Sequence, residues 1–507
     1  MKIIVDFSEL RPGGETGGVK PFLFALLKRL RTRFETPPKF IFLTNSATHD
    51  EVLHDLAAPS DELICVRRSH DAPLPAASAF APVERIMIPV EPDLPIQVQA
   101  DVFYAPFGTV DHAGPGVPIV SFVADLLHRD YPATLPPSGI AHREKTFAAA
   151  VERSVFFQCN SRHVIDRLHA EYGVPRDRAF HTYNLIHHRL ADDTEAALPS
   201  DLPDGPFFFY PANAWLHKNH DTLLTAYRHY KAATGSKAWP LVMTGHDDDS
   251  MGERLETAAA LGLEDSVIYL GFLEERSLCE VWRRASALIF PSLHEGFGIP
   301  LIEAMHFAVP ILASNICSLP EVAGDAAIYF DPRKPLEIAE AMRRVSSDDR
   351  LRERLIEKGS LRLRELERED FVRPLAQALE TASQLWPVPT VAGIALDGWV
   401  SSKLCVGLPE SARHGGKLTM AFVDGTPEAH LSLYAFGMPL GSFANRDLFG
   451  REITIEIPPG VKAVSAKTHN GRNLSPQDPR IHSIRLCSID FEPTGTGEKI
   501  RLVEIKQ

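Results

Sequence analysis

Residues 290–305 read Phe-Pro-Ser-Leu-His-Glu-Gly-Phe-Gly-Ile-Pro-Leu-Ile-Glu-Ala-Met, and this order places the end of a strand, a glycine loop and the start of a helix in succession. Pro300 suits the first turn of a helix, where a backbone N–H has no intrahelical partner to lose. Gly296 and Gly298 allow the backbone to approach a ligand, and the N-terminus of the following helix presents unpaired N–H groups to an anion. The segment therefore predicts a diphosphate site.

Glu303 is the acidic residue that follows this loop. We expect it in the first helical turn, where its carboxylate would accept hydrogen bonds from the two hydroxyls of a ribose. A glutamate that merely complements the helix dipole is the alternative, and it explains Glu303 but not the Gly-Phe-Gly loop beside Glu295.

Short apolar runs alternate with helical patterns on both sides of a polar, proline-rich stretch at residues 192–206. Such runs are typical of strands buried on both faces of a parallel sheet. They predict an α/β chain with two Rossmann-like domains, one over residues 1–195 and one over residues 205–370. The predicted strands lie at residues 3–5, 40–43, 119–123 and 155–159 in the first domain and at 207–210, 241–244, 267–270, 287–290 and 310–313 in the second.

The C-terminal part of the chain has a different pattern. Residues 335–385 are helical in period, and Trp-Pro-Val-Pro-Thr at 386–390 cannot continue a helix. We expect a returning helix and linker at residues 371–389. Short β-patterned runs then alternate with Gly, Pro and Asn turns, which predicts an all-β sandwich accessory domain over residues 390–507.

Composition limits the class of protein. With 507 residues, 44% hydrophobic and 23% charged, the chain is typical of a packed globular protein of several domains. Its formal charge of −13 argues against an extended nucleic-acid surface. The six cysteines form no close pair, and neither a signal peptide nor an uninterrupted run of about 18 apolar residues occurs, so we expect a cytoplasmic protein.

The stretch from Gly271 to Pro332 resembles the C-terminal half of the retaining glycosyltransferases of family 4, a group with the GT-B fold that includes mannosyltransferases. The motifs that carry this resemblance are the Glu-x7-Glu element at Glu295 and Glu303, Phe-Pro-Ser before it, Gly271-Phe272 after a strand, and Gly-Asp-Ala-Ala-Ile-Tyr-Phe-Asp-Pro at the end.

The resemblance implies roles for these residues. In the family the first glutamate faces the donor sugar and the second holds the ribose, which implies those roles for Glu295 and Glu303. Amides of the glycine loop meet the diphosphate. The donor contacts that follow are Phe272, Gly296, Phe297, Gly298, Ile299 and Glu303.

A second segment resembles the family's diphosphate-binding turn, which carries an arginine and then a lysine. It is residues 210–220, Tyr-Pro-Ala-Asn-Ala-Trp-Leu-His-Lys-Asn-His. Lys218 supplies the lysine, whose point charge would stabilise the leaving diphosphate. Asn213 stands at the arginine position and is expected in the same site, so His217 or a residue elsewhere would supply the missing charge. A solvated surface lysine is the alternative.

Two N-terminal segments complete the resemblance. Gly-Gly-Glu-Thr-Gly-Gly-Val at 13–19 resembles the family's glycine loop near the reaction centre, which makes Gly17 and Gly18 candidates; the spacing Gly-x-Gly-x-x-Gly of a dinucleotide site is absent. Residues 122–132 resemble the loop over the donor sugar, where a His-Asp pair is common. Ala124 stands at the histidine position, so Asp125 and His128 remain candidates for catalysis or for sugar contacts. A turn-forming aspartate and a surface histidine explain them equally well.

Metal binding is not expected. His-Asp-Asp-Asp at 246–249 follows a strand in a loop before a helix, where aspartate caps are common, and the resembled enzymes do not generally need a metal.

The resemblance implies a retaining hexosyltransferase, with mannose as one candidate sugar. The donor would be a GDP- or UDP-linked sugar and the acceptor a glycan or a lipid-linked molecule of bacterial-type polysaccharide or lipopolysaccharide synthesis, with the first domain on the acceptor side. No other cofactor and no nucleic-acid partner is implied. The basic helical pattern at residues 20–33 admits peripheral contact with an anionic membrane as well as a core helix with a solvated face. The alternatives are a non-catalytic carbohydrate-binding scaffold and a GT-B nucleotide-sugar epimerase.

Overall fold

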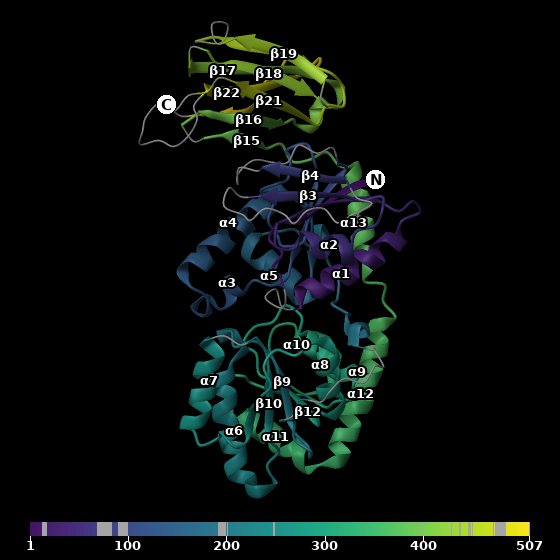
Figure 1. Cartoon of the computed structure of the whole chain (residues 1–507). Helices are drawn as coiled ribbons and strands as arrows, with labels where there is room; N and C mark the ends of the chain where they lie inside the picture. Colours follow the sequence, from purple (N-terminus) through teal and green to yellow (C-terminus); the bar gives the residue numbers. More distant parts are fainter. Residues whose placement is uncertain are drawn as a thin grey trace.

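The computed structural model stacks three bodies along one axis (Figure 1). An antiparallel β-sandwich lies at one end, the N-terminal α/β domain lies in the middle and the second α/β domain lies at the other end. The structure describes residues 1–12, 18–67, 84–89, 100–190, 199, 201–246, 249–395, 397–426, 428–435, 438–444, 448, 450–469, 471 and 483–505.

The N-terminal domain is built on an eight-stranded sheet in the order β4-β3-β2-β1-β5-β6-β7-β8, in which neighbouring strands are parallel. The strand order reverses between β1 and β5, which is where α/β sheets open a crevice at the carboxyl ends of their strands. The strands are β1 Lys2–Phe7, β2 Lys39–Thr44, β3 Glu62–Arg67, β4 Glu84–Pro89, β5 Val102–Ala105, β6 Ile119–Val123, β7 Ser154–Cys159 and β8 Ala179–His181. The helices are α1 Val19–Leu30, α2 His49–Asp55, α3 Leu127–Asp130, α4 Pro137–Arg153 and α5 Arg162–Tyr172.

The second domain repeats this design with a six-stranded parallel sheet in the order β11-β10-β9-β12-β13-β14. Its switch point lies between β9 and β12, so the loops that follow these two strands meet at one edge. The strands are β9 Phe208–Pro211, β10 Leu241–Thr244, β11 Val267–Tyr269, β12 Ala287–Phe290, β13 Ile311–Ser314 and β14 Ala327–Phe330. The helices are α6 His220–Thr234, α7 Asp249–Ala260, α8 Glu275–Arg284, α9 Ile299–His306, α10 Leu319–Ala323, α11 Pro335–Ser347 and α12 Asp349–Glu367.

The chain returns to the N-terminal domain after α12. Helix α13, Val372–Gln384, packs against α1 and buries Leu375 and Leu379 in the core of the first domain. The two domains are therefore joined by the segment that leaves β8 and by the segment that enters α13. This arrangement is the GT-B fold that the sequence predicts, and the expected fold class is confirmed.

The C-terminal body contains two antiparallel sheets, in the orders β15-β16-β21-β18-β19 and β20-β17-β22-β23, around a core of its own. Its strands are β15 Val391–Ile394, β16 Val400–Gly407, β17 Gly416–Gly425, β18 His430–Ala435, β19 Met438–Ala444, β20 Glu452–Ile457, β21 Ala463–His469, β22 Ile484–Pro493 and β23 Ile500–Glu504. It touches the N-terminal domain closely, because a Cβ on Gly116 would lie 2.9 Å from the Cβ of Ala463. The indole Nε1 of Trp386 donates to the carbonyl of Leu408 at 2.7 Å and ties the linker to the sandwich.

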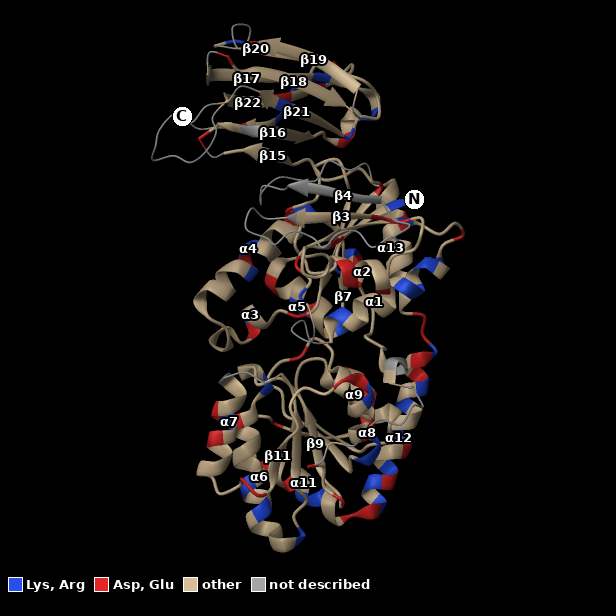
Figure 2. Cartoon of the chain, in the orientation of Figure 1, with Lys and Arg blue, Asp and Glu red and all other residues tan. Residues whose placement is uncertain are grey.

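Acidic and basic residues are interspersed along both α/β domains (Figure 2). The basic residues in and after α1 follow this pattern. Lys20 pairs with Glu51 at 2.5 Å, Arg31 pairs with Asp61, and Arg33 pairs with Asp370 at 2.8 Å. The prediction of peripheral membrane contact depends on the positive charge of this segment. Three of its basic residues are paired with carboxylates, which neutralise much of that charge.

Candidate functional site

The loops after β9 and β12 bring Lys218 and Glu295 together. The Nζ of Lys218 donates to Oε1 of Glu295 at 2.6 Å, and the two side chains are only 15% and 11% exposed. The same Nζ lies 5.6 Å from the centre of the Phe290 ring. Lys218 is therefore a partly buried cation held at the switch point, and the alternative of a solvated surface lysine is wrong.

The turn that carries Lys218 is held firmly in place. A single 3-10 turn, Leu216–Lys218, leads into α6 through Asn219, which has φ 67°. The Nδ2 of Asn219 donates to the carbonyls of Pro291 at 3.0 Å and Pro332 at 2.8 Å. Because Leu293 N also donates to His217 O at 2.7 Å, the turn is attached to the chain just before Glu295.

Asn213 holds two loops together. Its Oδ1 accepts a hydrogen bond from the backbone N–H of His246 at 2.8 Å, which joins the loop after β9 to the loop after β10. A role in binding the diphosphate at this position stays a prediction.

The glycines of the loop at 296–298 have a packing role that the sequence does not reveal. A Cβ on Gly296 would lie 1.8 Å from the carbonyl oxygen of Ala124 in the N-terminal domain, and a Cβ on Gly298, at φ 95°, would lie 2.5 Å from Leu319. Gly18, at the start of α1, meets Ile299 in the same way, with a Cβ-to-Cδ1 distance of 2.4 Å. Gly296 and Gly18 therefore let the two domains approach closely, and Gly298 lets the loop pack on α10 of its own domain. Gly17 lies outside the described residues.

The other predicted donor residues differ in exposure. Phe297 is buried and its ring centre lies 5.5 Å from that of Tyr183, so it packs between the domains. Phe272, in the second domain, is 60% exposed. Glu303 is 3% exposed, and it is the fifth residue of α9. The expectation that Glu303 lies in the first turn is wrong, because Gly298 is the N-cap and the helix already begins at Ile299. Glu303 is therefore not a helix cap, and its predicted role toward a ribose stays a prediction.

Asp125 faces the site from the N-terminal domain. Its Oδ1 accepts hydrogen bonds from Leu127 N at 2.9 Å and from Arg143 at 3.1 Å. Burial alone would raise the pKa of this carboxyl, but the nearby guanidinium of Arg143, together with His294 and the hydrogen bond from Leu127 N, holds it below its usual value.

His128 belongs to the packing of α3 on α4 and α5. Its side chain is fully buried, with Nε2 2.7 Å from the hydroxyl of Tyr172 and the ring centre 4.6 Å from that of Phe147. Burial lowers the pKa of this imidazole. The alternative, that His128 is a surface histidine, is wrong, and its predicted sugar contact stays a prediction.

His217 precedes Lys218 and is turned toward the same centre. Burial, followed by the positive charge of Lys218, lowers its pKa to about 4, while Glu295 and Asp125 act in the opposite direction. A neutral imidazole therefore stands between the two domains at neutral pH. Without a ligand it therefore carries no charge in place of the absent arginine, and a role for His217 toward the diphosphate stays a prediction.

A hydrogen bond between the domains was not predicted from the sequence. The Nε2 of His294, the residue before Glu295, lies 2.9 Å from Oδ2 of Asp130 at the end of α3. Arg167 donates to the other oxygen of Asp130 at 2.8 Å. Burial would raise the pKa of Asp130, and the hydrogen bonds from His294 and Arg167 lower it overall. The only signal in the sequence is the position of His294 directly before the motif.

Two further contacts close the same interface. Ser161 Oγ donates to the carbonyl of Gly296 at 2.8 Å. The carboxylate of Glu321, in α10, accepts hydrogen bonds from Arg162 N at 2.8 Å and His163 N at 2.9 Å, so it caps helix α5 of the other domain. The glycine loop thus meets the N-terminal domain at fixed points.

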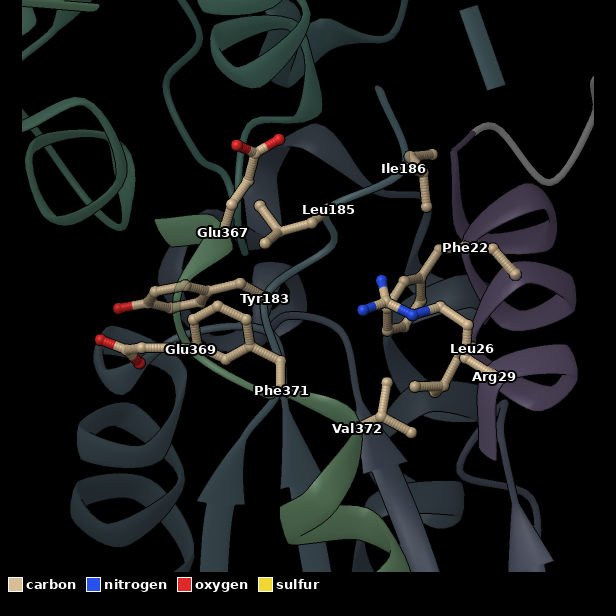
Figure 3. A pocket seen from close by; sticks show the side chains of 11 residues that line it. Phe22, Leu26, Arg29, Tyr183, Leu185, Ile186, Glu367, Glu369, Phe371 and Val372 are labelled. Carbon is tan, nitrogen blue, oxygen red and sulfur yellow. The ribbon is translucent and has the colours of Figure 1, made fainter. Parts of the chain in front are cut away.

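A separate cavity of about 310 Å³ lies beside the two segments that join the domains, away from the Lys218–Glu295 pair (Figure 3). Figure 3 shows Arg29 of α1 on one side and the rings of Tyr183 and Phe371 close together on the other. The remaining lining residues are Phe22, Ala25, Leu26, Leu185, Ile186, Glu367, Glu369 and Val372.

Within the described part of the chain, no group of three or more His, Cys, Asp and Glu side chains is placed to hold a metal ion. Asp247 and Asp248 lie outside that part, and Asp249 begins α7. No helix among the described residues is long and apolar enough to cross a membrane.

Residues 196–362 match the family model described as "Glycosyl transferases group 1". Over 139 residues the chain is 34% identical to the O-antigen chain mannosyltransferase B of Escherichia coli, a match that covers 27% of this chain and 35% of that protein. It is 30% identical over 234 residues to a serotype-specific mannosyltransferase WbdA of E. coli, covering 45% of this chain and 26% of the relative. The chain thus spans less than half the length of these curated relatives.

Solved structures resemble the chain in fold. HepE of Anabaena, in complex with UDP and glucose, matches with a TM-score of 0.51 and 16% identity over 76% of this chain and all of that one. A sucrose-phosphate synthase from Thermosynechococcus elongatus matches with a TM-score of 0.53 and 15% identity over 75% of this chain and 98% of that one. These structures show the GT-B fold. The match to the glycosyltransferase family model is confined to residues 196–362, and the predicted enzyme class is confirmed for that part of the chain.

Proposed function

We propose that the chain is a retaining glycosyltransferase that moves a hexose, with mannose the first candidate, from a GDP- or UDP-linked sugar to a glycan or lipid-linked acceptor. The observation that carries the proposal is the Lys218–Glu295 pair, 2.6 Å apart on adjoining loops of the group 1 domain. The O-antigen chain mannosyltransferase and the serotype-specific mannosyltransferase among the relatives support the choice of sugar, and the first supports a role in bacterial polysaccharide synthesis. Such synthesis would take place in the cytoplasm, at the inner face of the membrane if the acceptor is lipid-linked.

In the proposed reaction the acceptor hydroxyl attacks the anomeric carbon on the face from which the diphosphate departs. An oxygen of the leaving phosphate takes the hydroxyl proton, so no protein nucleophile is needed. Lys218 would exchange its bond to Glu295 for the departing phosphate and stabilise the developing charge. Glu295 would then accept hydrogen bonds from hydroxyls of the donor sugar and orient it.

The buried glutamate of α9 completes the donor site in this proposal. Glu303 would accept hydrogen bonds from the ribose, and the amides of residues 296–298 would face the diphosphate at the start of α9. The N-terminal domain would present the acceptor, with Asp125 at its edge of the site.

The test is to incubate the chain with GDP-mannose and a panel of other GDP- and UDP-sugars, with and without glycan acceptors, and to measure nucleotide release. Release that depends on an acceptor supports the proposal. Binding without release would indicate a carbohydrate-binding scaffold, and conversion of the donor sugar without transfer would indicate an epimerase.

A further inference from the structure

The turn that carries Lys218 also exposes two large apolar side chains. Trp215 is 43% exposed and Leu216 is 52% exposed, although both belong to a turn that hydrogen bonds fix to its surroundings. Among the described residues, Trp215 is the one tryptophan that exposes more than a third of its surface. Folding does not explain this exposure, and adjacent apolar residues rimmed by polar groups are typical of binding sites.

The tryptophan is continuous with the candidate site. Its ring centre lies 5.7 Å from that of His217, and the two planes are tilted by 32°. His217 in turn interacts electrostatically with Lys218 and Glu295 on its own domain and with Asp125 on the other. Three groups are thus neighbours in space: the aromatic ring of Trp215, the imidazole of His217, and the ionised carboxylate of Asp125, which accepts a hydrogen bond from Arg143.

This sequence of groups suits one kind of ligand. A pyranose ring has an apolar C–H face that packs on an aromatic ring and hydroxyls at its edge that bond to imidazole and carboxylate groups. Resting on the proposed function, we propose that Trp215, His217 and Asp125 form a subsite for a sugar residue of the acceptor glycan, with Trp215 as its stacking platform.

The subsite is rigid before any sugar arrives. Lys218 N donates to Trp215 O at 2.8 Å and Asn219 N donates to Leu216 O at 3.1 Å, which closes the turn. The bonds of Asn219 to Pro291 and Pro332 fix it to the loop of Glu295. A sugar stacked on Trp215 is therefore held at a constant position relative to the donor loop, and little ordering is needed on binding.

The experiment measures binding of α-linked mannotriose, maltotriose and cellotriose to the GDP-loaded full chain by calorimetry. We expect at least one to bind, Trp215→Ala to weaken it about tenfold or more, and Trp215→Phe to retain most of the affinity. GDP affinity should stay within about twofold of the unmodified chain. Leu361→Ala is the matched control, because Leu361 is 49% exposed on α12, which carries none of these groups.

Three results would overturn the subsite: no trisaccharide binds, Trp215→Ala binds sugar as tightly as the unmodified chain, or Trp215→Ala loses as much affinity for GDP as for sugar. The proposed function is tested separately by nucleotide release from the donor. If release is normal and Trp215→Ala binds sugar normally, the subsite alone fails. If no donor is turned over but sugar binding depends on Trp215, the proposed reaction fails and the subsite stands.

Discussion

Lys218 and Glu295, 77 positions apart, form a hydrogen-bonded ion pair of 2.6 Å between neighbouring loops of one domain. The pair exists because β9 and β12 are neighbours at the switch point of the sheet, so the loops that follow them lie side by side. In the proposed reaction the pair must open when the diphosphate reaches the lysine. The two partners therefore have separable roles.

Glu295→Gln should reduce turnover much more than nucleotide affinity. The substitution removes the charge that orients the donor sugar, yet it leaves Lys218 without a competing carboxylate, so affinity for the free nucleoside diphosphate should stay equal or rise. Steady-state rates and calorimetry with the free diphosphate measure the two effects. An equal loss in both quantities would contradict the assigned role.

Lys218→Ala should lower turnover by roughly 100-fold or more, as expected for a preorganised group that stabilises a leaving anion. Lys237→Ala, at an exposed position after α6, is the control and should behave like the unmodified chain. If Lys218→Ala retains a near-normal rate while its fold is intact by circular dichroism, the lysine does not act on the leaving group.

Glu303→Ala should weaken nucleotide binding by roughly 1.5–3 kcal/mol, the usual worth of hydrogen bonds to a charged partner. Because Glu303 is buried, its substitution is compared with Glu303→Gln and checked by thermal melting, and Glu365→Ala on the exposed face of α12 serves as the control. Unchanged nucleotide affinity in a folded Glu303→Ala chain would exclude the ribose role.

The low pKa of His217 predicts a pH effect on stability. The folded pKa is about 4 because of burial and Lys218, whereas an unfolded histidine titrates near 6.5. Between these values the unfolded chain binds the extra proton, so the free energy of unfolding falls as the pH drops from about 6.5 to about 4. The melting temperature of His217→Gln should therefore fall less between pH 7 and pH 5 than that of the unmodified chain. An identical loss in both would show that His217 titrates normally.

A chain that ends near residue 389 should fold and bind nucleotide, because every donor residue precedes that point and the sandwich has its own core. The contacts of Gly116 with Ala463 and of Trp386 with Leu408 are lost, so a modest fall in melting temperature is expected. Loss of nucleotide binding, or aggregation at micromolar concentration, would mean that the sandwich is part of the catalytic body.

The sequence predicts local features well where one segment determines them. The apolar run before residue 290, the glycines and Pro300 specify a strand, a loop and a helix in order, and the structure has them as β12, the loop and α9. The sequence places Glu303 in the first helical turn, but the residue lies one turn later. Gly298, with φ 95°, is the N-cap, and the helix therefore begins at Ile299.

Contacts between the domains could not be predicted in this way. His294 and Asp130 are 164 positions apart and Glu321 and Arg162 are 159 apart, so their pairing depends on how two separately folded domains dock. The close approach of Gly296 to Ala124 has the same origin, and the sequence shows only a glycine suited to a ligand.

The most direct test of the account is the anomeric configuration of the sugar in the product, followed by NMR during transfer from an α-linked donor such as GDP-mannose to a glycan acceptor. Retention predicts a new α-linkage from the first detectable product, with release of GDP in equal amount. A β-linked product, or no transfer from any GDP- or UDP-sugar in the panel, would contradict the proposed retaining transfer.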